Sequence, residues 1–147
     1  MKIDYSKILK NNMINVFRDV LKIIEKNGFK EGHHLYITFK TDDEDVIIPD
    51  WLKEKFPDKM TIIIQHEYWN FKVAKNNFNI TLSFNNIKSD LKIPFNSVIS
   101  FADPYANFGL KLNSLEKSTE RKDKKKTTII KAKNNIVDLN KFRKKLN

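Results

Sequence analysis

The side chains that could do acid–base or metal chemistry are few in this 147-residue chain. It has three histidines, His33, His34 and His66, three glycines and no cysteine. Because neighbouring residues on a strand point to opposite faces, His33 and His34 are not expected to share a metal ion. A metal site at His66 would need carboxylates from distant parts of the chain, and three glycines are too few for a phosphate-cradling loop. We therefore expect no metal, no cofactor and no catalytic centre.

The carboxylates offer no better candidate for catalysis. The acidic run 42–45 lacks the alternating ligands and the central glycine of a calcium loop, so it reads as a solvated acidic turn. A hydrolase site built from Asp103, His66 and Glu67 is a weak alternative, because no nucleophile accompanies these residues.

Binding is better supported, by a polar pair at the end of an apolar run. Gln65 and His66 follow that run and precede Tyr68 and Trp69. Amide and imidazole groups both donate and accept hydrogen bonds, which suits a main-chain or Asn-rich peptide partner, and aromatic rings give contact area at low entropic cost. The residues alone leave a second interpretation open, in which Trp69 and Phe71 are core residues and the polar pair is a solvated strand end.

The end of the chain differs in composition from the rest. Residues 114–135 are rich in lysine and have almost nothing to bury, so they should form a mobile tether. We expect a domain at 1–113, a flexible basic linker at 114–135 and a short docking motif at 136–147. The linker would span about 25 Å on average. When the docking motif is bound to a partner, a molecule bound to the domain would be kept near that partner at an effective concentration on the order of millimolar. The residues expected to dock on the partner are Ile136, Val137, Leu139, Phe142, Arg143 and Lys144.

Charge is divided unevenly between these parts. Residues 1–113 hold 16 basic and 14 acidic residues, a net charge of +2, whereas residues 114–147 hold 12 and 4, a net charge of +8. Only three of the 28 basic residues are arginine, the side chain that best reads guanine and grips phosphate. Specific nucleic-acid recognition is therefore poorly supported. No apolar run approaches the roughly 20 residues that span a bilayer, and the lack of cysteine fits a reducing cytosol, so we expect a cytoplasmic protein that does not enter membranes.

One helix and several strands must position these residues. Apolar residues recur at three- and four-residue steps from Ile8 to Ile24, which predicts an amphipathic helix over 3–27 that ends at Asn27 and Gly28. Asp50 is expected to cap a helical turn over 51–56. A period of two predicts short strands at 35–39, 60–65, 70–74, 78–84, 91–95, 98–101 and 108–112, with hairpin turns at 75–77 and 85–86. The expected class is α+β, mostly β: an N-terminal helix followed by a small, strongly bent antiparallel sheet or partly closed barrel.

Several ordered blocks of the chain resemble a known family. The blocks are 35–39, 46–52, 60–69, 78–86, 93–95, 101–110 and the terminal run 136–145. In them the chain resembles the SspB stringent-starvation adaptor family, in its alpha-proteobacterial branch. The resemblance covers about residues 5–112 and the final segment.

This resemblance implies an adaptor for the ClpXP protease. Family members are homodimers with a compact β fold likened to Sm proteins. They bind the ssrA degradation tag of stalled chains and hand the tagged protein to the ClpX unfoldase, whose N-terminal domain binds their C-terminal module. The residues that this implies for tag contact are Gln65, His66, Trp69, Phe84 and Phe101. The rival from another class is an Sm-like RNA-binding module with a basic tail, whose binding would weaken steeply with salt.

Overall fold

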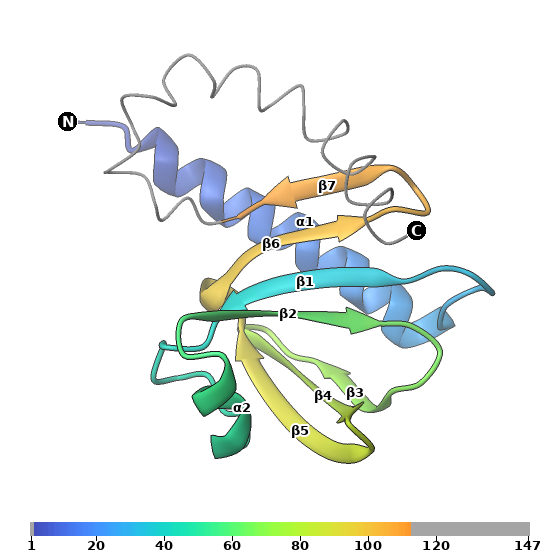
Figure 1. The fold of residues 1–147 in the computed structure, drawn as a ribbon. Helices are drawn as coiled ribbons and strands as arrows, with labels where there is room; N and C mark the ends of the chain where they lie inside the picture. Colours follow the sequence, from blue (N-terminus) through green and yellow to red (C-terminus); the bar gives the residue numbers. More distant parts are fainter. Residues whose placement is uncertain (1, 113–147) are drawn as a thin grey trace.

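The first helix lies against two antiparallel sheets (Figure 1). This computed structural model describes residues 2–112. The α+β class, mostly β with an N-terminal helix, is confirmed, whereas the predicted linker 114–135 and docking motif 136–147 lie outside the described residues. In chain order the elements are α1 (Tyr5–Asn27), β1 (Leu35–Lys40), α2 (Asp50–Lys55), β2 (Lys59–Ile64), β3 (Trp69–Val73), β4 (Asn77–Phe84), β5 (Ile87–Pro94), η1 (Phe95–Ser97), β6 (Val98–Asp103) and β7 (Phe108–Lys111).

Within residues 2–112 the strands form two sheets and no closed barrel. The four-stranded sheet has the order β2-β1-β6-β7 and the three-stranded sheet the order β3-β4-β5, with every neighbouring pair antiparallel. The consecutive strands β2 and β3 belong to different sheets. Where we expected one strongly bent sheet, the strands are therefore divided between two sheets. That division falls at the 65–68 segment, which contains the polar pair singled out above.

α1 ends at Asn27, as the sequence predicts, and begins at Tyr5, two residues after the predicted start at residue 3. The Asp4 carboxylate accepts a hydrogen bond from the Lys7 N–H at 3.1 Å, and Gly28, with φ at 74°, ends the helix in a conformation that favours glycine. The prediction for α2 was wrong in one respect. Asp50 does not cap this helix, because it is the first helical residue and Pro49 occupies the N-cap position without a side-chain hydrogen bond.

The apolar stripe of α1 is only partly used for packing. Its buried residues are Ile14, Phe17, Leu21 and Ile24. The predicted stripe also included Ile8, Leu9 and Val16, whose side chains are 51%, 60% and 41% exposed. The N-terminal half of the helix therefore keeps an apolar surface that no described residue covers. No helix within residues 2–112 is long and apolar enough to cross a lipid bilayer.

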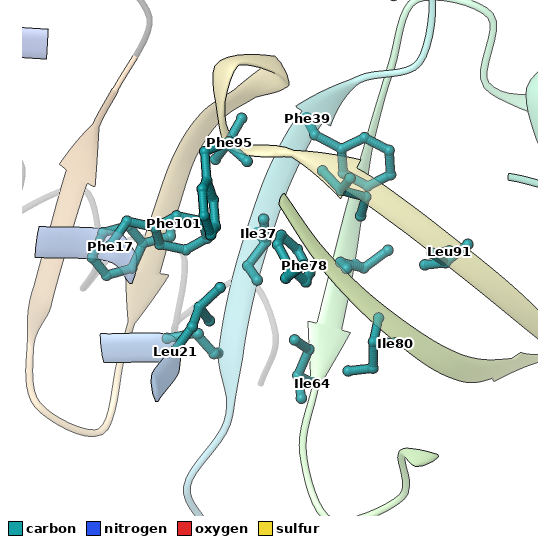
Figure 2. Packing of buried hydrophobic residues seen from close by; sticks show 14 of the residues in the cluster. Phe17, Leu21, Ile37, Phe39, Ile64, Phe78, Ile80, Leu91, Phe95 and Phe101 are labelled. Atoms are coloured by element: carbon teal, nitrogen blue, oxygen red, sulfur yellow. The ribbon is translucent and has the colours of Figure 1, made fainter. Parts of the chain in front are cut away.

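Phe17 is the α1 side chain that packs beside Phe101 and Phe95 in the core (Figure 2). Its ring lies 6.1 Å from that of Phe78, 5.8 Å from that of Phe95 and 4.9 Å from that of Phe101. These partners come from β4, η1 and β6, so one side chain joins the helix to both sheets. Complete burial of a ring of this size stabilises a fold by about 1.5–3 kcal/mol.

The two predicted hairpin turns form in different ways. Asn85 and Asn86 have φ of 54° and 67°, which gives the tight β4–β5 turn that the sequence predicts. The β3–β4 turn is instead closed by a 2.8 Å hydrogen bond from the Ala74 N–H to the Asn77 carbonyl. A positive φ that we did not expect occurs at Asn70, where β3 shifts its register against β4.

Candidate functional site

Gln65 and His66 lie at one end of the four-stranded sheet, where three connecting segments meet. Because β1 is antiparallel to β2 and β6, its first residues pair with the last residues of both neighbours. The α1–β1 loop (28–34), the β2–β3 loop (65–68) and the β6–β7 turn (104–107) therefore emerge at the same end, on the right in Figure 1.

A hollow of about 670 Å³ lies between the first two of these loops. A volume in the range of roughly 300–1,000 Å³ is typical of sites that bind a small molecule or a few residues of a peptide. The residues that line it are Phe29, Lys30, Glu31, Gly32, His33, His34, Gln65 and His66.

The two predicted binding residues in the hollow are available to a ligand. The side chains of Gln65 and His66 are exposed, and neither makes a hydrogen bond with any residue of the described range 2–112. The Gln65 amide offers a donor and an acceptor on one planar group, which matches the donor and acceptor of a peptide bond. The hollow therefore presents groups suited to reading an extended main chain.

The opposite wall of the hollow depends on two glycines in loop 28–34. Gly28 and Gly32 have φ of 74° and 83°, a region that side chains with a Cβ rarely adopt. A 2.9 Å hydrogen bond from the His33 N–H to the Lys30 carbonyl closes a turn between them. Nδ1 of His34 lies 3.2 Å from the carbonyl oxygen of Gly32. The loop is thus bent back on itself beside the β2–β3 loop.

The placement of His33 and His34 on a strand was wrong, since both precede β1. The two rings have different partners. Nε2 of His33 lies 3.0 Å from an oxygen of Asp103, whereas the ring of His34 packs edge-to-face on that of Tyr36 at 5.2 Å. Within residues 2–112 no three side chains of the metal-binding types gather closely enough to hold a metal ion.

The three residues of the hydrolase alternative are not brought together in one hydrogen-bonded group. Both oxygens of Asp103 are engaged, one by His33 and the other by the Ala106 N–H at 3.1 Å. His66 and Glu67 are exposed on the β2–β3 loop. The carboxylate that would orient a catalytic histidine therefore faces a different histidine.

Trp69 and Phe84 lie outside the hollow and on opposite faces of the three-stranded sheet. Trp69 is 36% exposed, pairs with Thr81 and has Nζ of Lys88 4.1 Å from its ring centroid. Phe84 is three residues beyond Thr81, so its side chain leaves the other face, where its ring packs edge-to-face on that of Trp51 at 6.5 Å. Neither aromatic ring lines the hollow that contains Gln65 and His66.

Phe101 lies in the core and not on a binding surface. Its side chain is 2% exposed and packs against Phe17 under the helix, as Figure 2 shows. The residues that cover it include Phe17 of α1 and Phe108 of β7, whose rings lie 4.9 Å and 6.0 Å away. The buried ring of Phe101 is therefore not available to a bound peptide.

Sequence reasoning missed the residues of loop 28–34 as part of this site. One local signal was available, because Gly28 and Gly32 enclose a short polar segment between a predicted helix and a predicted strand. That signal indicates a loop, but it does not indicate which other loop lies beside it. The register of β1 with β2 supplies this information.

A second hollow, of about 380 Å³, lies on the outer face of the three-stranded sheet. Three of its polar side chains are hydrogen-bonded to one another: the Asn70 amide donates to the Thr81 hydroxyl at 3.2 Å, and that hydroxyl donates to Asp90 at 2.6 Å. These groups are already paired, whereas Gln65 and His66 have no partner among the described residues. The first hollow is therefore the better candidate for binding a ligand.

Comparison with protein-family models gives a match over most of the chain. The family model described as stringent starvation protein B matches residues 8–143, which includes every described strand and part of the segment 136–147. No curated protein matches the chain. The matched range covers most of the chain, and the chain therefore belongs to the stringent starvation protein B (SspB) family.

Proposed function

We propose that this protein is a non-catalytic adaptor that binds ssrA-tagged polypeptides and tethers them to the ClpX unfoldase for degradation by ClpXP. Membership of the SspB family is consistent with an adaptor role in proteolysis. The observation that carries the proposal is the hollow in which Gln65 and His66 stand exposed without partners among residues 2–112. The proposal also includes a cytoplasmic location and the alpha-proteobacterial branch of the family.

An extended tag has a place to lie beside this hollow. β2 is at the edge of the four-stranded sheet and pairs with β1 but with no other described strand. The backbone of an edge strand can pair with an added peptide, which gives affinity, while pockets alongside read the peptide's side chains. In this arrangement the Gln65 amide hydrogen-bonds a peptide group of the tag as the tag passes the end of β2.

Delivery would depend on the residues after 112. The linker 114–135 carries cargo on a tether about 25 Å long, and the motif 136–147 docks on the N-terminal domain of ClpX. Short contacts of this kind are weak separately, but linking them raises the effective concentration of cargo to the order of millimolar. Release of cargo then needs no large barrier, because each contact is small.

The exposed part of the α1 stripe supports a homodimer. Ile8, Leu9 and Val16 are exposed apolar side chains along one side of the helix, with Asn12 between them, and apolar groups gathered on a surface mark sites of association. A dimer would carry two tails and so bind the unfoldase with greater avidity. Sedimentation at micromolar concentration tests this, with Leu9→Lys as the variant expected to shift the protein to monomer. A wild-type protein that sediments as a monomer would count against the dimer.

The experiment that tests the adaptor function separates its two halves. The affinity of the full chain for a fluorescent ssrA peptide is measured by titration. In a second experiment, degradation of an ssrA-tagged substrate by ClpXP is measured with and without the full chain. A truncation that lacks residues 134–147 should bind the peptide with unchanged affinity and lose the enhancement of degradation. Loss of peptide binding in this truncation would contradict the assigned division of labour.

A further inference from the structure

We propose that the His33–Asp103 pair is the device that positions the peptide site, by holding loop 28–34 against the β6–β7 turn. This inference rests on the proposed function, since it assigns roles within the same site. Loop 28–34 supplies six of the eight residues that line the hollow, whereas the β2–β3 loop supplies two. The shape of the hollow therefore depends on what keeps that loop in place.

The pair joins segments that are 70 residues apart in the chain. Nε2 of His33 lies 3.0 Å from Oδ2 of Asp103, and the two side chains are only 21% and 15% exposed. Oδ1 of the same carboxylate accepts the Ala106 N–H at 3.1 Å. One carboxylate thus fixes its own turn and the loop opposite. A hydrogen bond to a charged partner that is largely shielded from water is stronger than one on an open surface.

Aromatic packing extends this link to the second wall of the hollow. The ring of His33 lies 5.0 Å from that of Tyr105 and 4.9 Å from that of Phe29. Phe29 in turn packs edge-to-face on Tyr68, at 6.0 Å. This row of rings connects the β6–β7 turn, loop 28–34 and the β2–β3 loop that carries Gln65. The His33 ring lies between those of Phe29 and Tyr105, and its hydrogen bond to Asp103 fixes its position there.

Loop 28–34 has few other means of holding its shape. Two of its residues are glycines with positive φ, which leave the unrestrained backbone a wide choice of conformations. The backbone hydrogen bonds donated by Gly28 and His33 are local, to the carbonyls of Ile24 and Lys30. If the pair were broken, binding a peptide would have to order the loop as well, and that ordering weakens affinity. His33 and Asp103 are therefore positioning residues, and Gln65 and His66 make the contacts.

The test compares variants of His33 in the full-length chain. His33→Leu keeps an apolar group between Phe29 and Tyr105 but removes the hydrogen bond, and should weaken binding of a fluorescent ssrA peptide on the order of tenfold. His33→Gln can still donate from its amide to Asp103 and should restore most of the affinity. Asn79→Ala, which removes a 3.2 Å hydrogen bond from the Asn77 amide in the three-stranded sheet, is the control and should bind as the wild type does.

Partner and exchange measurements make the result decisive. Asp103→Ala should weaken peptide binding as His33→Leu does. The double variant should bind the peptide no less tightly than the weaker-binding single variant, because the two residues act as a unit. Amide hydrogen exchange in the free protein should quicken at 29–34 in both single variants, with the amides of β4 unchanged. This measurement needs no peptide, so failure of the wild type to bind the tag would overturn the proposed function alone. Wild-type affinity and unchanged exchange in His33→Leu, or in Asp103→Ala should the former not fold, would overturn the positioning role.

Discussion

Replacing Gln65 by alanine should weaken tag binding without changing the stability of the fold. The side chain is exposed and makes no hydrogen bond with residues 2–112, so removing it leaves no buried group unsatisfied. Its amide can form one donor and one acceptor bond with a peptide group. At about 0.5–1.5 kcal/mol for each bond, the loss is about 1–3 kcal/mol, which corresponds to a rise in Kd of roughly 5-fold to 140-fold.

The assay is fluorescence anisotropy of a labelled ssrA peptide, with a urea melt of each variant in parallel. Gln65→Glu keeps the length of the side chain and the acceptor but removes the donor, so its Kd should lie between those of the wild type and Gln65→Ala. Glu67→Ala is the matched control, because Glu67 is exposed on the same loop but does not line the hollow. An unchanged Kd in Gln65→Ala, or an equal rise in Glu67→Ala, would refute the assignment of the hollow as the tag site.

Three further predictions concern the core, the acidic loop and the rival function. Phe101→Ala should lower the free energy of unfolding by about 3–5 kcal/mol in a urea melt, since it leaves a cavity beside Phe17, and a loss below about 1 kcal/mol would argue against its burial. Hydrogen bonds donated to the Asp43 carboxylate hold its pKa below the ordinary value of 3.8; the bond from the Ser97 hydroxyl has the larger effect and the bond from the Asp45 N–H the smaller. A lowered carboxyl pKa stabilises the fold above the ordinary value, and this contribution disappears as the pH falls through the lowered folded-state value. Asp43→Asn should therefore be less stable than the wild type at pH 7, with the gap closing below pH 3.8; a gap that persists in strong acid would contradict this. Peptide affinity should change little with salt, whereas an RNA-binding module would lose affinity steeply as phosphate contacts release counterions.

Local patterns were sufficient to predict most of the elements. The period of α1 and the glycine at its end identify the helix, and the alternation in β2 identifies a strand whose residues Met60, Ile62 and Ile64 are buried while Thr61 and Ile63 are exposed. Asn85 and Asn86 identify a hairpin turn because few other residues accept positive φ. These signals succeed because each depends on neighbours in the chain.

The candidate site could be predicted only in part. Gln65 and His66 stand out because, together with Glu67, they interrupt an apolar and aromatic run. Trp69 and Phe84 have the composition of binding residues too, but the register of β3 with β4 sends them to opposite faces. Phe101 has the same aromatic character, and the packing of α1 across β6 buries it. Composition alone does not distinguish an aromatic ring that packs from one that binds.

The amino-acid sequence by itself determined which stretches form the helix and the strands, which of their faces are apolar, and that a polar pair follows β2. The tertiary structure decided the division into two sheets, the meeting of loop 28–34 with loop 65–68, and the pairing of His33 with Asp103 across 70 residues. The physical reason is that local preferences act within a few residues, whereas the partner that covers an apolar face is chosen by the free energy of burying all such faces together.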